Sequence, residues 1–440
     1  MEVLNLGMVG GGTVGSGVFH ALQQNGALLA ARIGIRIHVR KVAVKSVEEP
    51  RPYPIPRRFL TTNWREVVED PQVQLVTELV GGTTVAREVV ETALRLGKPV
   101  ITANKALLSA HGPALFAEAE RHGTNLYFEA SVCGGIPILK ALREGFVGNR
   151  VTALYGIVNG TCNYILTRMT QERADFQTVL REAQQEGYAE TPPDLDIDGH
   201  DAQHKTGILA SLAHGHWIPA DYIAVEGIRA ITPLDLQFAA QLGYTIKLLG
   251  IVKQLKERAR HQGEVPLQVS VYPALVPSDH VLARVQGVYN AVFVRGDVVG
   301  DTLFYGRGAG KDATASAVLS DLADAALDVR LGTRRRRPAF VKGPDAVRVV
   351  PLDDVVSRSF VRLSVIDQPG VLARIAAVFG RARIGIASVI QPEGHTGEVV
   401  PLILMLHEAP DGAVRKALDR IARLPVVKAP PVRFRVESLT

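Results

Sequence analysis

A short apolar strand that runs into a glycine-rich turn and then a helix constrains the fold of this chain more than any other feature. The strand-like residues are Leu4 to Val9, the turn reads Gly10-Gly-Gly-Thr-Val-Gly15, and an apolar-periodic helix continues to about Leu29. Glycines at this spacing let the backbone approach a pyrophosphate, whose charge the helix N-terminus stabilises. A glycine-rich turn without a ligand is the alternative, but the agreement of strand, turn and helix favours a dinucleotide site. The candidate contacts are Gly10, Gly12, Thr13, Val14 and Gly15.

Strands and helices alternate after this first unit. Further strand-like runs are Ile35–Val44, Val73–Val80, Pro99–Thr102 and Asn125–Phe128, and the intervening segments Val85–Leu96 and Pro113–His122 have helical patterns. This alternation predicts an α/β fold, a doubly wound parallel sheet of the Rossmann type in residues 1–130.

The end of the second strand bears on the choice of cofactor. Sites that prefer NAD usually place Asp or Glu there, to bind the ribose 2′-hydroxyl. This strand ends with Val44, Lys45 and Ser46, so a lysine occupies that position. Lys45 suits a 2′-phosphate and favours NADP, while Glu48 and Glu49 leave NAD possible.

A second candidate position follows the strand at Pro99–Thr102. Ligands of open α/β sheets bind at the carboxyl ends of the strands, and Thr102 and Lys105 lie at that edge. Lys105 could reach both the nicotinamide and a reacting carbonyl. An ordinary surface lysine that begins a helix is an equally good interpretation of the position alone.

The acidic block Glu190–Lys205 is the most distinctive stretch of polar sequence. Asp201 and Lys205 are four residues apart at the start of an apolar helical run, so their side chains should share one helix face. A lysine beside carboxylates can transfer a proton or grip a small zwitterion. Together with the glycine turn, this block suggests a redox enzyme that acts on a charged, amino-acid-like substrate.

The rest of the chain divides into further parts. Closely spaced strands in residues 131–312 predict an α+β catalytic and dimerisation domain with a largely antiparallel sheet, and Leu234–Lys247 is among its predicted helices. The helix at 313–331 is expected to pack back on the first domain, and 332–357 is expected to form a basic linker. Residues 358–440 have the order βαββαβ, which predicts a ferredoxin-like domain.

Charge and cysteine content limit the remaining classes. The net charge of +6 comes largely from Arg334–Arg337, which has no interleaved aromatic residues, so a solvated linker is favoured over nucleic-acid binding. The absence of a long apolar run and of a secretory signal at residue 1 predicts no membrane association. Two cysteines in the whole chain predict a reducing, cytoplasmic location. The histidines near residue 200 match no zinc spacing.

With these motifs identified, the chain resembles the homoserine dehydrogenase family, in its monofunctional form with a C-terminal ACT domain. The resemblance runs almost end to end. It rests on the glycine turn, Thr102–Lys105, Phe128–Pro137, Gly156–Asn163, the Glu190–Lys205 block and Phe304–Gly310. It implies reduction of L-aspartate 4-semialdehyde to L-homoserine by a nicotinamide cofactor, on the route to threonine, methionine and isoleucine.

The resemblance also implies roles for individual residues. Glu190 binds the substrate ammonium, while Asp196 and Asp201 order the substrate and the lysines. Lys205 protonates the developing alkoxide, with Lys105 as its partner or its rival. Gly310 closes over the cofactor. A hinge cation, usually sodium, is held in the family by backbone carbonyls, and the matching positions are Glu129, Val132, Gly134 and Ile136.

The C-terminal unit resembles an ACT domain on the strength of Asp367–Leu372 and Ile386–Gln391. Such domains pair across subunits and bind amino acids, so we expect a homodimer or homotetramer that threonine inhibits. A purely structural ACT domain remains the alternative.

Competing functions make different demands on the sequence. Aspartate-semialdehyde dehydrogenase needs a nucleophilic cysteine, and neither Cys133 nor Cys162 has the setting for one. A non-catalytic sensor of dinucleotide and amino acid would be favoured by loss of Lys105 or Lys205, yet both are present. A nucleic-acid-binding protein would use Arg334–Arg337 and bind in a salt-sensitive manner.

Overall fold

The computed structural model describes residues 1–255, 264–333, 340, 346–392, 395 and 397–439. These residues form two compact units, each built from several stretches of the chain. Unit 1 comprises Met1–Thr152, His204–Ala220 and Asn290–Asp345, and unit 2 comprises Ala153–Gln203, Asp221–Tyr289 and Ala346–Thr440. The predicted basic run Arg334–Arg337 lies outside the described residues.

Unit 1 contains a parallel sheet with the strand order β3-β2-β1-β4-β5-β6. Its strands are β1 (Glu2–Val9), β2 (Ile35–Ala43), β3 (Leu60–Thr61), β4 (Leu75–Glu78), β5 (Val100–Thr102) and β6 (Leu126–Tyr127). Chain crossovers on both sides of β1 make this a doubly wound sheet, as predicted for residues 1–130.

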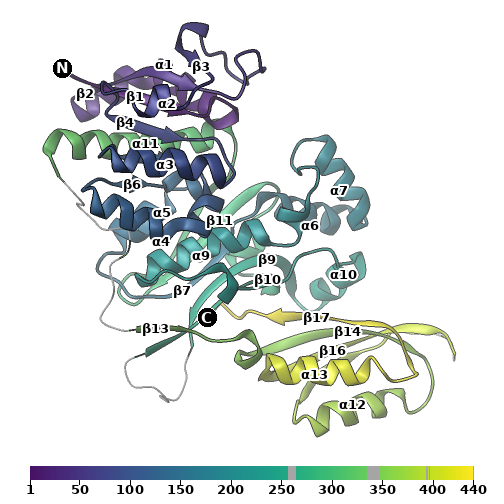
Figure 1. Ribbon diagram of the computed structural model, residues 1–440. Helices are drawn as coiled ribbons and strands as arrows, with labels where there is room; N and C mark the ends of the chain where they lie inside the picture. The colour runs from purple at the N-terminus through teal and green to yellow at the C-terminus, as the bar shows by residue number, and fades with distance from the viewer. Residues whose placement is uncertain (256–263, 334–339, 341–345, 393–394, 396, 440) are drawn as a thin grey trace. The chain divides into compact units, whose positions relative to one another are not determined.

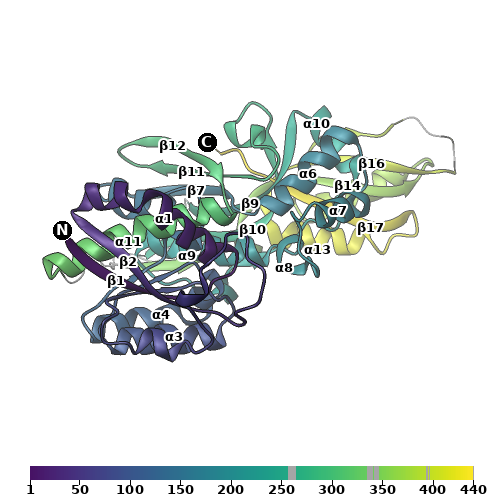
Figure 2. The same cartoon turned by 90° about the horizontal axis from the view of Figure 1, so that it is seen from above.

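Helices cover both faces of this sheet, with α1 and α11 on one face and α3 and α4 on the other (Figure 2). The helices of unit 1 are α1 (Thr13–Ile33), α2 (Arg65–Val68), α3 (Thr84–Arg95), α4 (Lys105–Arg121), α5 (Ile138–Lys140) and α11 (Lys311–Leu331). Apolar side chains of α1 and α11, among them Val18, Phe19, Val318 and Leu322, pack on β1 and β2 in one core. Helix α11, which is far from α1 in the sequence, thus completes the core of the N-terminal sheet.

Helix α4 begins earlier than predicted. The sequence pattern placed its start at Pro113, whereas the helix begins at Lys105 and continues through Pro113. The reason is the N-cap, because the side chain of Asn104 accepts a hydrogen bond from the backbone N–H of Leu107. Lys105 is therefore the first residue of a helix whose start is fixed by its neighbour.

Unit 2 is built around a mixed sheet. Its strands run in the order β7-β9-β10-β17-β14-β16-β15, and β8 and β13 each pair with β10. Their bounds are β7 (Val151–Ile157), β8 (Ala224–Val225), β9 (Tyr244–Gln254), β10 (Glu264–Pro277), β13 (Ala346–Val349), β14 (Val356–Ile366), β15 (Ile386–Ile390), β16 (Val399–Pro410) and β17 (Val427–Val436). Strands β11 (Tyr289–Gly296) and β12 (Gly300–Arg307) belong mainly to unit 1.

Within residues 131–312 the predicted largely antiparallel pairing is present, because β9 pairs antiparallel with both β7 and β10. The sheet as a whole is mixed, because β10 also pairs in parallel with β8, β13 and β17. The predicted helix Leu234–Lys247 is wrong in its second half. Helix α10 ends at Gln241, Gly243 has a φ of 82°, and β9 begins at Tyr244. The left-handed glycine ends the helix, and the apolar run after it pairs with β10.

The other helices of unit 2 are α6 (Gly160–Glu172), α7 (Phe176–Gln185), α8 (Asp194–Ile197), α10 (Pro233–Gln241), α12 (Val371–Arg381) and α13 (Asp411–Ile421), while α9 (His200–His214) begins in unit 2 and continues in unit 1. The C-terminal elements follow one another in the predicted βαββαβ order, from β14 to β17. Helices α12 and α13 lie together on one face of these strands (Figure 1), and their apolar side chains share a core with β14 and β16.

No helix in the described ranges combines the length and the apolar character needed to cross a bilayer.

Candidate active site

The glycine turn between β1 and α1 has a backbone that only glycine tolerates at two positions. Gly10 has a φ of 109°, and a Cβ atom there would lie 2.4 Å from the carbonyl oxygen of Leu79. A Cβ on Gly15 would lie 2.0 Å from the carbonyl oxygen of Gly10. Both positions therefore require glycine for steric reasons.

The open side of the same turn fits a nucleotide. A Cβ on Gly12 would meet nothing within 4 Å, so space remains beside the start of α1. No side chain caps this 21-residue helix, and its first turn, which begins with Thr13 and Val14, has no acidic residue. An uncapped helix N-terminus offers backbone N–H groups and a positive potential to a pyrophosphate.

Basic residues surround the end of β2. Lys45 is exposed two residues after the strand. Arg51 donates to the carbonyl oxygens of Ser46 and Glu49 at 2.5 and 2.7 Å and so fixes the loop. The earlier basic residues of this strand are engaged elsewhere, because Arg40 pairs with Asp70 and Lys41 pairs with Glu66. Lys45, exposed just beyond the end of β2, is therefore the candidate ligand contact among Arg40, Lys41 and Lys45.

Thr102 and Lys105 lie at the carboxyl edge of the parallel sheet, as their position in the sequence predicted. A buried carboxyl that the sequence reasoning missed organises this edge. Glu78, at the end of β4, accepts hydrogen bonds from the Thr102 hydroxyl at 2.7 Å and the Val80 N–H at 2.9 Å. Burial raises the pKa of Glu78.

The network of Glu78 continues to the residue before Lys105. The Thr102 hydroxyl accepts from the N–H of Asn104 at 3.0 Å, and the Asn104 side chain donates to the carbonyl of Gly82 at 2.7 Å. The loops after β4 and β5 are thereby joined, and the helix that starts at Lys105 is anchored. An acid inside an otherwise apolar strand was the available signal for Glu78.

In unit 2, Asn159 brings two of the predicted carboxylates together. Its side-chain nitrogen donates to Asp196 Oδ1 and to Asp201 Oδ2, each at 2.8 Å. Thr161 donates to the other oxygen of Asp196 at 3.3 Å. The sequence predicts that the polar turn Asn159–Asn163, which follows a strand, lines the cleft. In the structure Asn159 lies after β7 and directly before α6, where it contacts both carboxylates.

Asp201 and Lys205 lie one turn apart on α9, as predicted, and both are buried, with 4% and 8% of their surface exposed. Asp196 is half-buried on α8. The side chain of Glu190 is exposed, and within the described residues no hydrogen bond joins it to Asp196 or Asp201. Asp196 and Asp201 are thus the two carboxylates of the acidic block that share Asn159 as a hydrogen-bond donor.

The predicted cation loop around Glu129 contains oxygen atoms that could bind a cation, but some of them already accept hydrogen bonds from nearby N–H groups. The Glu129 carboxylate accepts from the N–H groups of Leu139 at 3.0 Å and Lys140 at 2.7 Å, and burial raises its pKa to about 7. The carbonyl of Ile136 accepts from the N–H of Ile138 at 2.7 Å. A carbonyl has a second lone pair, so these oxygens remain chemically suited to a hard monovalent cation.

The other two residues of the predicted cation loop, Val132 and Gly134, flank a residue with a left-handed backbone, and Gly134 lies close to α11. Val132 is buried, and a Cβ on Gly134 would lie 2.8 Å from the Thr314 hydroxyl. Cys133 between them has a φ of 51°, in the left-handed region. No group of three or more His, Cys, Asp or Glu residues in the described chain could hold a metal ion, so the backbone would supply the ligands.

Gly310 is the N-cap of α11 and has a φ of 119°, and a Cβ atom added to it would meet nothing within 4 Å. Its backbone conformation favours glycine, and the space beside it is open.

Comparisons with known proteins identify the family to which this chain is similar. The family model of the homoserine dehydrogenase NAD-binding domain matches residues 10–129, and the homoserine dehydrogenase model matches residues 137–323. Homoserine dehydrogenase of Pseudomonas aeruginosa is 40% identical over 446 residues, which cover 100% of both chains.

Solved structures give the same result. A homoserine dehydrogenase from Thiobacillus denitrificans has a TM-score of 0.91 and 39% identity, covering 100% of this chain and 99% of its own. A hyperthermophilic archaeal homoserine dehydrogenase in complex with NADPH has a TM-score of 0.61 and 25% identity, covering 74% of this chain and 98% of its own.

Proposed function

This chain belongs to the homoserine dehydrogenase family, and on that premise we propose which of its residues carry the activity. The family activity makes it an NAD(P)-dependent oxidoreductase of amino-acid biosynthesis that reduces L-aspartate 4-semialdehyde to L-homoserine. The observation that carries the residue assignment is the pair of carboxylates, Asp196 and Asp201, held by Asn159 one helical turn from Lys205.

The proposed nucleotide site is the uncapped start of α1. The N–H groups at Thr13 and Val14 hold the pyrophosphate, and Gly10, Gly12 and Gly15 give it access. Lys45 binds a 2′-phosphate, which favours NADP over NAD. The exposed lysine and the absence of an acid at the end of β2 support this preference. Thr102, Lys105 and Gly310 border the nicotinamide.

The proposed substrate site uses the acidic block. Glu190 and Asp196 bind the ammonium, and Asp201 keeps Lys205 charged and oriented. When bound, the nicotinamide supplies the hydride that the aldehyde carbon accepts. Lys205 then donates a proton to the alkoxide oxygen, which becomes the hydroxyl of homoserine. Lys105 orients the carbonyl oxygen from the edge of the parallel sheet.

Steady-state turnover of aspartate semialdehyde tests these roles. We expect Lys205→Ala to lower kcat by about 10²–10⁴-fold while nucleotide binding persists. Lys416→Ala removes an exposed lysine of α13 and should leave turnover unchanged. Retained turnover in Lys205→Ala, with collapse in Lys105→Ala, would transfer the proton-donor role to Lys105.

The cofactor preference needs its own comparison. We expect NADPH to give the higher kcat/KM, and Lys45→Ala to reduce the ratio of NADPH to NADH efficiency by about tenfold. Lys41→Ala is the matched control, because that lysine pairs with Glu66 instead. An unchanged ratio in Lys45→Ala would remove this lysine from the nucleotide site.

The C-terminal βαββαβ elements are proposed to be an ACT domain that binds threonine, and the enzyme is proposed to be a cytoplasmic homodimer or homotetramer. The turn at Asp367 supports an effector site, because Gln391 of the neighbouring segment donates to the Asp367 carboxylate at 3.1 Å. Threonine should inhibit the full-length enzyme, and Asp367→Ala should abolish inhibition without lowering uninhibited turnover. Inhibition that survives this change would place the effector elsewhere.

A cation in the Glu129–Ile136 loop is the last part of this proposal. The carbonyl groups of Glu129, Val132, Gly134 and Ile136 would hold sodium, and the ion would stiffen the loop. Replacing sodium with the bulky tetramethylammonium ion should lower the thermal stability of the enzyme. An unchanged melting temperature over a range of sodium concentrations would remove the cation from this loop.

A further inference from the structure

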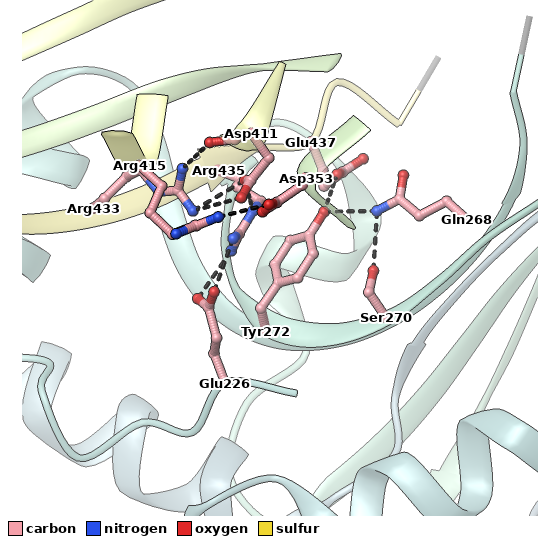
Figure 3. A network of polar contacts seen from close by, with 10 residues as sticks. All are labelled: Glu226, Gln268, Ser270, Tyr272, Asp353, Asp411, Arg415, Arg433, Arg435 and Glu437. Atoms are coloured by element: carbon pink, nitrogen blue, oxygen red, sulfur yellow. Dashed lines mark hydrogen bonds and ion pairs between the residues drawn. The ribbon is translucent and has the colours of Figure 1, made fainter. Parts of the chain in front are cut away.

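The largest fully buried side chain among the described residues of unit 2 is an arginine near the C-terminus. Arg435 on β17 is 1% exposed. Its Nε donates to Asp411 Oδ1 at 2.6 Å, and its two terminal nitrogens donate to the two oxygens of Glu226 at 2.9 and 2.8 Å. Its guanidinium also lies 4.4 Å from the ring centroid of Tyr272 (Figure 3). Each of the three guanidinium nitrogens of Arg435 thus donates to a carboxylate.

Near Arg435, strand pairing and side-chain hydrogen bonds connect the end of β17 to β10. Arg435 lies opposite Ala274 in a short parallel pairing. The Tyr272 hydroxyl donates to Glu437 at 2.7 Å and accepts from Gln268 at 2.9 Å, as Figure 3 shows. The C-terminal elements and the central strand β10 are therefore joined by buried polar contacts, which are worth more at low dielectric than at the surface.

Glu226 extends this junction toward the acidic block. Its own N–H donates to the carbonyl of Val271 at 2.8 Å, which ties it to β10. A Cβ on the next residue, Gly227, would lie 2.3 Å from the carbonyl oxygen of Ile197, so the chain touches α8 directly. The N–H of Ile228 donates to that same carbonyl at 2.8 Å.

Arg229 completes the contact with α8. It forms ion pairs with Asp194 and Asp198, which flank Asp196, and its second nitrogen lies 2.9 Å from Asp198 Oδ2. Glu226–Arg229 therefore contacts the C-terminal elements at one end and α8 at the other.

A four-residue helix has little stability of its own, so its position depends on what packs against it. Helix α8 carries Asp196, which shares Asn159 with Asp201. A shift of Glu226–Arg229 would move the Asp196 carboxylate relative to Asp201.

We propose that Glu226 is a positioning residue, which transmits the placement of Arg435 and the C-terminal elements to Asp196 through Gly227–Arg229. This inference rests on the substrate-binding role proposed above for Asp196. Through this link the C-terminal elements set substrate affinity, and the contact gives any signal they receive a route to the substrate carboxylates.

Steady-state kinetics of the full-length enzyme test the link. Glu226→Gln keeps the shape of the side chain and removes its charge, and we expect KM for aspartate semialdehyde to rise about three- to tenfold. The KM for NADPH should not change. Asp353→Asn is the matched control, because the side chains of Asp353 and Glu226 are similarly exposed, at 52% and 44%, but Asp353 pairs with the exposed Arg415 and Glu226 with the buried Arg435. It should alter neither KM.

A double-mutant cycle gives the sharper result. Glu226→Gln and Arg229→Gln act on the same helix, so their effects on the substrate KM should be non-additive, whereas Glu226→Gln and Asp353→Asn should add. An unchanged substrate KM in Glu226→Gln overturns the inference. So does an equal change in both KM values together with a lower Tm, which would mark a purely structural role.

The proposed function fails by a different measurement. If Asp196→Asn leaves the substrate KM unchanged, Asp196 does not bind substrate, whatever Glu226 does. If Glu226→Gln does not fold, Glu226→Asp, which keeps the charge, should show the same selective rise in substrate KM on a smaller scale. A substrate KM unaltered in that variant overturns the inference.

Discussion

The nucleotide end of unit 1 and the acidic block of unit 2 are held in place by different means. In unit 1, the turn at Gly10–Gly15 owes its shape to backbone atoms in close contact, and Glu78 fixes the neighbouring edge through hydrogen bonds to hydroxyl and N–H groups. In unit 2, α8 is braced by charged side chains, and Arg435 lies at the end of that chain of contacts.

The difference lies in sequence distance as much as in chemistry. Gly10 and Gly15 shape each other within one turn, so the motif can be read from adjacent residues. Glu226 and Arg435 are 209 positions apart and become partners only through folding. Substitutions that remove charge should therefore harm unit 2 most, and substitutions that add volume should harm the turn of unit 1.

The largest effect should come from Arg435→Leu. Leucine fills part of the volume but leaves Asp411, which is 4% exposed, with Arg433 as its remaining ion-pair partner. Breaking a buried pair by removing one member costs about 3–5 kcal/mol, and the second arginine should hold the loss near about 3 kcal/mol. Denaturant unfolding monitored by circular dichroism measures this change.

Arg415→Leu is the control for the same charge at the surface. Arg415 and Asp353 are half-exposed, and such pairs contribute about 0–1 kcal/mol. If the two leucine variants lose equal stability, charge burial is not what distinguishes this region.

The same distinction explains what the sequence could predict. The glycine turn, the doubly wound sheet and the pair Asp201–Lys205 follow from local spacing, and the structure has all three. The polar turn at Asn159 is predicted to line the cleft, but its hydrogen bonds could not be predicted, because α8 and α9 bring the two carboxylates to it only in the folded chain. The domain boundaries drawn from the sequence stay predictions.

Two further misses have physical reasons. The parallel pairing of β10 with β17 could not be predicted, because the sequence of an apolar strand does not show whether its partner runs parallel or antiparallel to it. Glu226 has no unusual neighbours in the sequence, and its importance arises from Arg435 and from the close approach of Gly227 to α8.

A smaller effect, confined to nucleotide binding, is expected from Gly15→Ala. The added methyl would meet the Gly10 carbonyl at 2.0 Å and displace the turn. A misplacement of about 1 Å can cost about 100-fold, so we expect NADPH affinity to fall by that order. Fluorescence titration of NADPH measures it.

Gly26→Ala in the same helix is the matched control for added volume. A Cβ there meets nothing within 4 Å, and the helical interior favours alanine over glycine by roughly 0.5–1 kcal/mol. This variant should bind NADPH normally and be slightly more stable. A loss of NADPH affinity in Gly26→Ala equal to that in Gly15→Ala would show that the turn geometry is not the cause.

The smallest expected effect is on the pH dependence of stability. It compares two buried carboxyl groups of unit 1 with an ion-paired carboxyl group of unit 2. Burial raises the pKa of Glu129 to about 7 and that of Asp321 to about 8, and the negative charge of Glu129 raises the pKa of Asp321 further. The Arg229 guanidinium lowers the pKa of Asp198 in unit 2.

These shifts act on stability with opposite signs. For Glu129 and Asp321 the folded state retains protons that the unfolded chain has released. The free energy of unfolding that these two groups contribute is therefore complete in acid and is lost as the pH rises toward about 8. For Asp198 the contribution is present at neutral pH and is lost in acid.

Asp321→Asn should therefore flatten the decline in stability of unit 1 between about pH 5 and pH 8, because it removes a group that takes part in this titration. Asparagine keeps an oxygen to accept from the N–H of Glu129, so the fold should persist.

Hydrogen exchange, measured as a function of pH and corrected for intrinsic rates, tests this prediction. Peptides from α5 and α11 report the stability of unit 1, and peptides from α8 report that of unit 2. An unaltered pH slope in the α5 and α11 peptides would mean that Asp321 does not hold its proton through this range. A change in α8 of the same size would mean that the two regions do not respond to pH separately.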